Sequence, residues 1–369
     1  MLSLLAAFPL RLAAQIDLTV DHVGIAIGDV PRVIGLRLNY RDRRLERVDG
    51  VNATIWSPYQ NGSRGLVRGI ALGVPVTGAD RIDGIGIGIL GVGAQDRFRG
   101  IGIGAAGVGS GGDLEGLMIG GLGVGSGHDV KGIGVGGLGI GSGGSLYGGF
   151  VGGFGAGSGK DIVGVVIGGL GAGASGDVTG IVVGGLGAGA SRDVTGLLVG
   201  GLGVGAGGSA RGILVGGLGV GASKDVRGIA VGGLGVGAGE RFTGLAIGGV
   251  GVGAGEVLRG VGIALVGVGA PDVRGLALAG LGAGARDARG ALVSAGLTRL
   301  EHGTLRSAEG RAARSRDRHR ELRRGAPWRA ARADQHRAQQ LAWNESAAGG
   351  ERASGLGVPG SGGPAVRDI

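Results

Sequence analysis

The chain has 369 residues, of which 97 are glycine, 8 are proline and none is cysteine. The lack of cysteine excludes disulfides, thiolate metal sites and cysteine nucleophiles, and uneven glycine spacing with so little proline excludes a collagen helix. The net charge of +9 is a poor argument for nucleic-acid binding, because more than half of it falls in residues 301–369.

Residues 1–15, MLSLLAAFPLRLAAQ, have the features of a remnant secretory signal. An apolar run from Leu2 to Leu10 is followed by small residues before Gln15, as at a cleavage site. A basic segment ahead of the apolar run is missing, so we expect the true start to lie upstream and the protein to be exported. The alternative is a short apolar strand that covers the first coil.

Residues 16–68 are expected to form an N-terminal cap and diverged coils. The stretch LRLNYRDRRLERVDG is more polar than the rest, and a polar cap keeps the edge of the first coil from pairing with other chains. We interpret the acidic residues and the histidine at the start of this cap as solvated turn residues rather than a catalytic site: Asp17, Asp21, His22 and Asp29.

From Gly84 to Arg259 the chain repeats every 16 residues, eleven times without a gap. One copy reads GIVVGGLGAGASRDVT and the next GLLVGGLGVGAGGSAR, and coils of 15 residues extend the region to 69–300. A short fixed period is typical of a solenoid, in which each unit stacks on the last.

Each repeat, numbered from its leading glycine as position 1, predicts one coil. Aliphatic residues at positions 2 and 4, and again at 7 and 9, alternate as in half-buried strands, and we expect them to point inward. The phase slips at the Gly-Gly pair at positions 5 and 6, which predicts a corner; polar positions 12–14 predict a second. The fold class is all-β: a single-chain parallel β-solenoid of 15–16-residue two-strand coils, with a polar N-terminal cap and an irregular C-terminal tail.

Residues 301–369 form a basic, low-complexity tail with no strand or helix period. It is either disordered, or an arm for an anionic surface, or an out-of-frame product. For the last hypothesis, back-translation of Arg318 to Gln340 with a one-nucleotide shift can give GIVNYAEELHGVQLGLINIARNN, which has coil-like alternation.

If positions 2 and 4 point inward, position 3 points outward, although it carries apolar residues. Such an exposed apolar stripe indicates contact with a protein or with the envelope surface; the alternative is packing on the cap or on further C-terminal coils. The stripe comprises Met118, Phe150, Val166, Val182, Leu198 and Leu214.

The strings GSGGDLEG, GSGHDVKG and GSGKDIVG partly resemble the calcium-binding RTX repeat. Calcium takes six to eight oxygen ligands, and one carboxylate per coil, interrupted at Ser145 and Ser209, supplies too few. We therefore interpret the aspartates as turn residues that cap N–H groups, with weak cation binding as the alternative. The residues at position 14 are Asp113, Asp129, Asp161, Asp177, Asp193 and Asp225.

No other motif indicates chemistry. GxGxxG strings recur by chance in so glycine-rich a repeat and lack a strand–loop–helix context, and no two of the five histidines have metal-ligand spacing. We predict no enzyme activity and no cofactor.

The units GIVVGGLGAGASRDVTG and GILVGGLGVGASKDVRG resemble uncharacterised bacterial glycine-rich short-repeat surface or secreted proteins, with coils of the type GLxIGGxGVGAGGDVxG, over residues 19–300. This resemblance implies an extracytoplasmic location and brings no known activity or catalytic residues. The predicted function is a non-enzymatic exported protein that presents a rod-like repeat surface, as a scaffold or an adhesive.

Two alternatives come from other classes. One is an outer-membrane β-barrel with one strand per repeat; uniform turn lengths and the lack of aromatic girdles argue against it. The other is a soluble intracellular protein with an unrecognised activity. The sequence argues against nucleic-acid binding and leaves the partner and the oligomeric state open.

Overall fold

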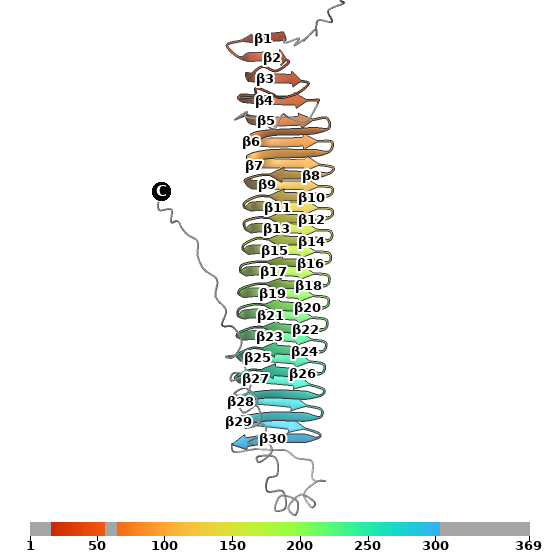
Figure 1. The fold of residues 1–369 in the computed structure, drawn as a ribbon, viewed down its shortest axis with the longest axis vertical. Helices are drawn as coiled ribbons and strands as arrows, with labels where there is room; N and C mark the ends of the chain where they lie inside the picture. Colours follow the sequence, from red (N-terminus) through yellow and green to blue (C-terminus); the bar gives the residue numbers. More distant parts are fainter. Residues whose placement is uncertain (1–15, 56–64, 303–369) are drawn as a thin grey trace, which may run out of the picture. The chain divides into compact units, whose positions relative to one another are not determined.

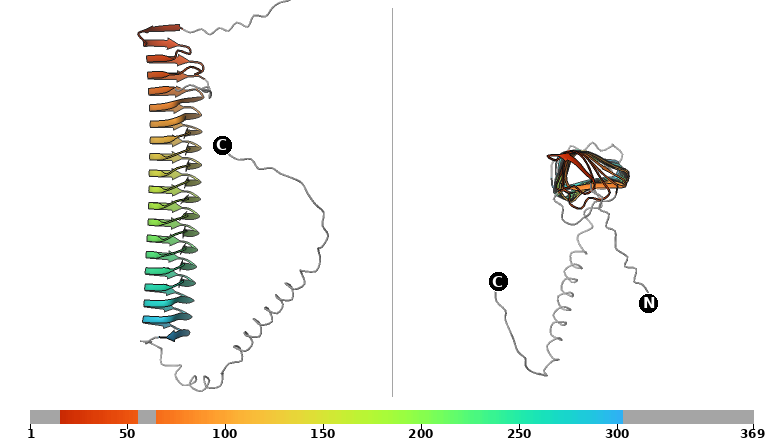
Figure 2. Two further views of the ribbon diagram at one scale, coloured as in Figure 1. Left: turned by 60° about the vertical axis from the view of Figure 1, so that its left-hand side comes forward. Right: turned by 90° about the horizontal axis from the view of Figure 1, so that it is seen from above.

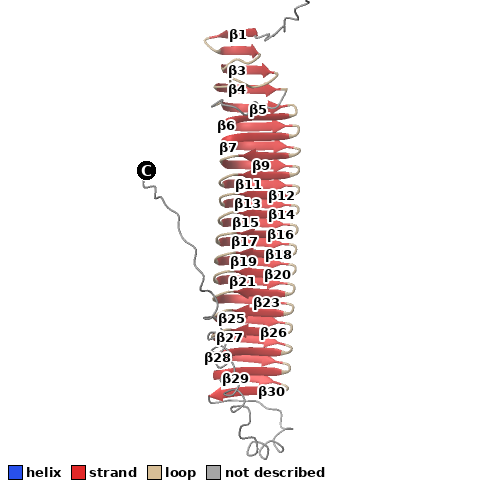
Figure 3. Ribbon diagram, in the orientation of Figure 1, coloured by secondary structure: helices blue, strands red, loops and turns tan. Residues whose placement is uncertain are grey.

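The computed structural model describes residues 16–55 and 65–302, and this part of the chain consists of strands and turns only (Figure 3). The strands wind into a parallel β-solenoid of about 16 turns, which confirms the predicted fold class (Figure 1). The signal-like segment 1–15 and nearly all of the tail, 303–369, lie outside the described residues.

The first described strands form a hairpin and then the first coils. β1 (Ile16–Val20) pairs antiparallel with β2 (Val23–Ile27). Asp21 and His22 between them have φ values of 51° and 67°, the left-handed geometry of a two-residue hairpin turn. The strands that follow pair in parallel, each with the next: β3 (Arg32–Asn39), β4 (Arg47–Thr54), β5 (Leu66–Gly73), β6 (Val76–Gly88) and β7 (Gly91–Gly104).

Each regular repeat supplies a long strand and a short strand. The long strands are β9 (Asp113–Gly120), β11 (Val130–Gly136), β13 (Leu146–Gly152), β15 (Ile162–Gly168), β17 (Val178–Gly184), β19 (Val194–Gly200), β21 (Ala210–Gly216), β23 (Val226–Gly232), β25 (Arg241–Gly248) and β27 (Val257–Ala264). The short strands are β8 (Gly107–Ser110), β10 (Gly123–Ser126), β12 (Gly139–Ser142), β14 (Gly155–Ser158), β16 (Gly171–Ala174), β18 (Gly187–Ala190), β20 (Gly203–Ala206), β22 (Gly219–Ala222), β24 (Gly235–Ala238) and β26 (Gly251–Ala254). The ladders end in β28 (Gly267–Ala279), β29 (Gly282–Ser294) and β30 (Leu297–His302). The alternative with one strand per repeat is therefore wrong.

Equivalent positions stack directly from coil to coil. Long strands pair with long strands, as Val194 does with Ala210, and short strands with short strands, as Gly203 does with Gly219. The strands of successive coils lie almost directly over one another along the stack (Figure 2). Every side chain therefore belongs to a column of equivalent side chains about 4.8 Å apart.

The core is lined by positions 15, 3 and 5 of the long strand and positions 9 and 11 of the short strand. In one coil Val194, Leu198 and Val204 are buried. Large inward side chains fit against inward glycines: a Cβ at Gly134 would lie 2.9 Å from the ring of Phe150. The predicted inward placement of position 9 is confirmed, whereas that of positions 2, 4 and 7 is wrong. The long strand runs unbroken from the inward position 15, so positions 1, 3 and 5 point inward and positions 2 and 4 point outward.

Two glycine columns allow the coil to close. Position 1 has a left-handed backbone throughout; at Gly196 φ is +135°, and a Cβ would lie 2.0 Å from the Gly180 carbonyl oxygen. Position 5 ends the long strand, and a Cβ at Gly216 would lie 2.1 Å from the Gly219 carbonyl oxygen across the corner. The corner itself lies at positions 6 and 7, one residue later than predicted.

Candidate interaction surface

The apolar stripe predicted at position 3 is inside the solenoid. Its six side chains are at most 1% exposed and belong to the core. The prediction failed because it took positions 2 and 4 as inward, which placed position 3 on the outside. The buried residues are Met118, Phe150, Val166, Val182, Leu198 and Leu214.

The surface that is exposed instead consists of positions 2 and 4, which we call the aliphatic face. It runs along the long-strand ladder from Ile25 and Ile27 in β2 to Ala291 and Val293 in β29. Every residue in it is isoleucine, leucine, valine or alanine, with Gly149 as the one exception. Individual side chains are 57% exposed at Ile133, 44% at Val151 and 44% at Ile213.

A ridge of leucines borders this face at the corner that follows it. Position 7 is about half exposed in coil after coil, and its side chains extend the apolar surface around the corner. The ridge comprises Leu122, Leu138, Phe154, Leu170, Leu186, Leu202, Leu218, Leu234 and Val250.

Position 16 of the long strands borders the other side of the face, and we call this column the rim. Its side chains are polar except at Val163. It starts at Asp49 in β4 and ends at Arg289 in β29. In its N-terminal half acids and bases alternate, and Arg99 Nε donates to Glu115 Oε2 at 2.8 Å. In its C-terminal half the charged residues are all arginine: Arg211, Arg227, Arg259, Arg274 and Arg289.

The rim is the signal that could have revealed the aliphatic face. Position 16 has the same parity as positions 2 and 4 along one unbroken strand, so all three must point to the same side. Charged side chains such as Arg99 and Arg227 do not fit a thin aliphatic core, so this side is the outer one. The sequence reasoning missed this because both sides of the strand carry aliphatic residues.

The outer side of the short strands carries almost no side chains. Positions 8 and 10 are glycine, and a shallow groove follows positions 10–12 of successive coils. In one coil it is lined by Gly173, Ala174 and Ser175. Glycine at positions 8 and 10 therefore leaves this surface nearly flat.

The aspartates of position 14 form one column where the chain enters the long strands: Asp113 is the first residue of β9, and the others directly precede their strands. The backbone N–H of Asp177 donates to Asp161 Oδ1 at 2.8 Å, and that of Asp193 to Asp177 Oδ1 at 3.0 Å. The capped N–H groups therefore belong to the next coil, which ties adjacent turns together. Asp113, Asp129 and Asp193 make the equivalent bonds to the N–H groups of Asp129, Ser145 and Ser209.

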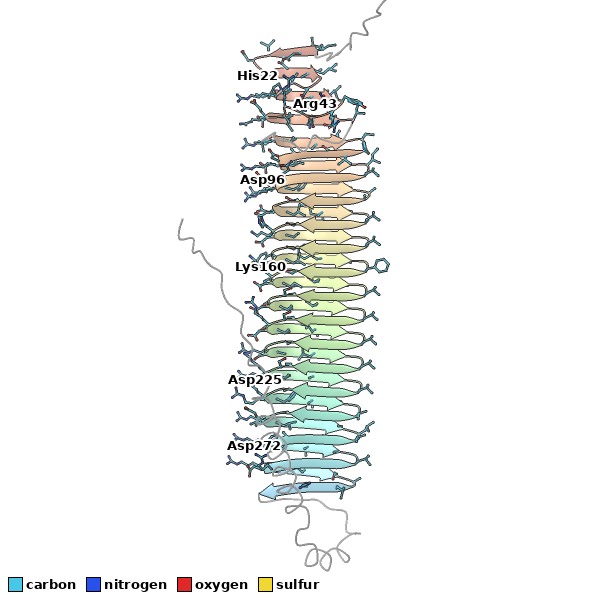
Figure 4. All side chains as sticks on the ribbon, in the orientation of Figure 1. His22, Arg43, Asp96, Lys160, Asp225 and Asp272 are labelled. Carbon is cyan, nitrogen blue, oxygen red and sulfur yellow. The ribbon has the colours of Figure 1, made fainter. Side chains whose placement is uncertain are left out.

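Asp225 differs from the other members of the column, because it is buried and two arginines hold it. Arg241 donates to it through Nε at 3.0 Å and through Nη2 at 3.2 Å, while Arg227 lies 3.4 Å away. The hydrogen bond from Arg241 lowers the pKa of Asp225. These residues line a cavity of about 370 Å³ with Thr243 and Arg259. In Figure 4, Asp225 lies on the same edge as Asp96, Lys160 and Asp272.

The N-terminal coils bury a polar network beside aliphatic core residues such as Val33 and Val48. Arg37, at position 3 of β3, is fully buried; its Nη1 donates to Asp42 Oδ1 and to Asn52 Oδ1, the latter at 2.8 Å. Its Nε donates to the Val30 carbonyl at 2.8 Å, and its Nη2 to Asp29 Oδ1 at 3.0 Å. Asp29 is thus a partner of a buried cation rather than only a solvated turn residue.

Asp42 is the main anionic partner of Arg37. Burial by itself would raise its pKa, but the Arg37 charge and hydrogen bonds from Asn39, Thr54 and Arg37 outweigh burial and lower the pKa below its usual value. Thr54 Oγ1 donates at 2.7 Å and Asn39 Nδ2 at 2.8 Å. The network is internally paired, so it fixes the first coils rather than offering an open site.

Within residues 16–55 and 65–302, no three histidine, cysteine, aspartate or glutamate side chains converge on a point where they could hold a metal ion. The same residues include no helix that could span a membrane. Comparison of the chain with protein-family models, with curated proteins and with solved structures finds no match.

Proposed function

We propose that this is a non-enzymatic structural or interaction protein, exported from a bacterial cell, whose working surface is the aliphatic face. The observation that carries this proposal is the continuity of that face. It takes about 17 ladder steps of about 4.8 Å and is about 10 Å wide, or about 800 Å². The largest apolar patch on a typical monomer is about 300–600 Å², so a face of this size supports a contact role.

The composition of the face supports the same conclusion. A soluble strand usually places polar residues on its outer side, and the repeat does so at position 16 and in the turns. Positions 2 and 4 stay aliphatic in every coil except at Gly149, even beside Arg37 and Asn52, where the core becomes polar. The outer side is thus more uniformly apolar than the inside, which coil folding alone does not require.

Because the chain has no cysteine, single cysteine variants can test export and contact together. Val165→Cys places a thiol on the aliphatic face, and Ser175→Cys places one on an exposed turn of the same coil. Intact cells of the producing bacterium are treated with a maleimide that does not cross the inner membrane. We expect labelling of the Ser175→Cys variant and protection of the Val165→Cys variant.

Each other outcome contradicts part of the proposal. If neither variant reacts until the cells are lysed, the protein is not exported. If both react at the same rate, the aliphatic face is not in contact with anything in its native location. Equal reaction of the two denatured variants is the control for labelling efficiency.

A further inference from the structure

We infer that the aliphatic face is covered by the aliphatic face of a second copy of this chain, the two solenoids packing face to face in antiparallel order. This inference rests on the proposed function, because it assumes that the face is the contact surface, and it goes further by naming the occupant. Three observations carry it: the area of the face, its shape and the charges on its rim.

The area fits a stable homodimer. The face offers about 800 Å² per copy at the ladder spacing, and a standard specific interface buries about 800 Å² on each partner. The leucine ridge adds to this area along one side. Homodimer interfaces are also richer in apolar surface than transient ones, and between Ile25 and Val293 no charged residue occurs at positions 2 and 4.

The shape favours an identical partner. Successive strands lie over one another with little rotation (Figure 2), so the face is nearly flat along its length. Flat sheets are typically stabilised by stacking on another sheet. A second copy has the same spacing between coils, so its rows of aliphatic side chains match those of the first copy at every coil. A partner with another spacing would lose register within a few coils.

The rim indicates the order of the two copies. A two-fold axis that lies in the interface and runs along the strands, perpendicular to the ladder, brings the two rims together. The N-terminal half of one copy then lies beside the C-terminal half of the other. With full overlap the axis passes between Gly149 and Val165, and Arg227 and Arg259 come opposite Asp83 and Asp49 of the second copy. Arg211 comes opposite Arg99, whose charge is already paired with Glu115 of its own chain. A two-fold axis along the ladder would instead place each rim beside the leucine ridge of the partner.

The first experiment is the mass of the purified full-length chain by sedimentation equilibrium. We expect about twice the chain mass of 35.7 kDa. Val165→Lys would bury two unpaired ammonium groups per dimer and should weaken association by at least ~100-fold. Gly149→Lys is a second variant on the face, where an added Cβ meets nothing within 4 Å and folding is not disturbed. Ser175→Lys, on the exposed turn, should leave the mass unchanged.

The outcomes separate this inference from the proposed function. A monomeric wild-type chain would overturn the inference, while protection of Val165→Cys in cells would still support the proposed function with another occupant. Binding of the monomer to vesicles of phosphatidylethanolamine and phosphatidylglycerol, lost in Gly149→Lys, would assign the face to a lipid surface instead. A dimer that both lysine variants leave intact would likewise overturn the inference.

The order of the copies is tested by mixing Asp83→Cys with Arg227→Cys and adding a short bis-maleimide. Antiparallel packing predicts cross-linked dimers that contain one chain of each variant. A lack of mixed cross-links, whether or not either variant cross-links to itself, would overturn the antiparallel order.

Discussion

Replacing Leu198 by alanine should destabilise its coil far more than replacing Leu197, its neighbour in β19. Leu198 is fully buried between Val182 and Leu214 in the position 3 column. Leu197 lies at position 2 on the aliphatic face and is partly exposed. The two substitutions remove the same atoms from adjacent residues, so their difference measures only which side of the strand faces the core.

The expected magnitudes follow from burial. Truncation of Leu198 removes three methylene-sized groups from the core, which costs about 2.4 kcal/mol in transfer free energy at ~0.8 kcal/mol each. The cavity left in a core one side chain thick raises the loss to about 3–4 kcal/mol. In the Gly149→Lys background, which keeps the chain monomeric, truncation of Leu197 should cost about 1 kcal/mol, because that side chain is already partly in contact with solvent.

Amide hydrogen exchange in β19 and its ladder neighbours measures these values locally, as the free energy of opening. A local measurement suits a repeat array, whose coils need not unfold as one unit. The Leu198→Ala variant should lose protection in β17, β19 and β21, and the Leu197→Ala variant should retain most of it. Equal losses, or a larger loss for Leu197→Ala, would refute the assignment of the core side.

Three further predictions concern glycine, charge and a buried hydroxyl. Gly196→Ala should prevent regular stacking, because its Cβ would lie 2.0 Å from the Gly180 carbonyl oxygen. Gly205→Ala is the control, since its Cβ would meet nothing within 4 Å. The circular dichroism spectrum and melting temperature should change in the first variant and stay almost unchanged in the second. Asp42→Asn should destabilise the first coils by about 3 kcal/mol, because it leaves a buried cation without its main anion; exchange of amides in β3 and β4 measures this. The pKa of Asp42 is lowered in the folded state, so its stabilising contribution is complete above about pH 4 and is lost as the pH falls through the pKa of the folded state. Protection from amide exchange in β3 and β4 of the wild-type chain should therefore fall in acid, and the Asp42→Asn variant should lack this dependence. Thr77→Val should raise the stability by about 1 kcal/mol, since the Thr77 hydroxyl is buried with no hydrogen-bond partner among the described residues; thermal melting would contradict this if the midpoint fell.

The fold followed from the sequence because it depends on periodicity. A 16-residue repeat with two apolar segments and two turn segments can bury its aliphatic residues only by stacking equal positions, and the register of Val194 on Ala210 is the period itself. The polar turns at positions 12–14 were also predictable, since an aspartate such as Asp161 fits a turn whether it caps its own coil or the next.

The polar core of the cap could not be read from the sequence. Arg37 meets Asp29, Asp42 and Asn52 because three chain segments converge inside the first coils. In the sequence these residues are simply polar, and a polar stretch indicates solvent exposure more often than burial. Pairing between side chains of different coils turns them into a core.

The sequence by itself determined the period, the parallel ladders and the number of strands per coil. Only the tertiary structure decided which side of the long strand faces inward. Both sides carry aliphatic residues, so alternation alone allows either phase, and Leu197 and Leu198 are chemically identical candidates for the core. The choice is made by closure of the coil: Val194 and Val204 must both lie inside it and the rim outside it, so Leu198 is buried and Leu197 is partly exposed.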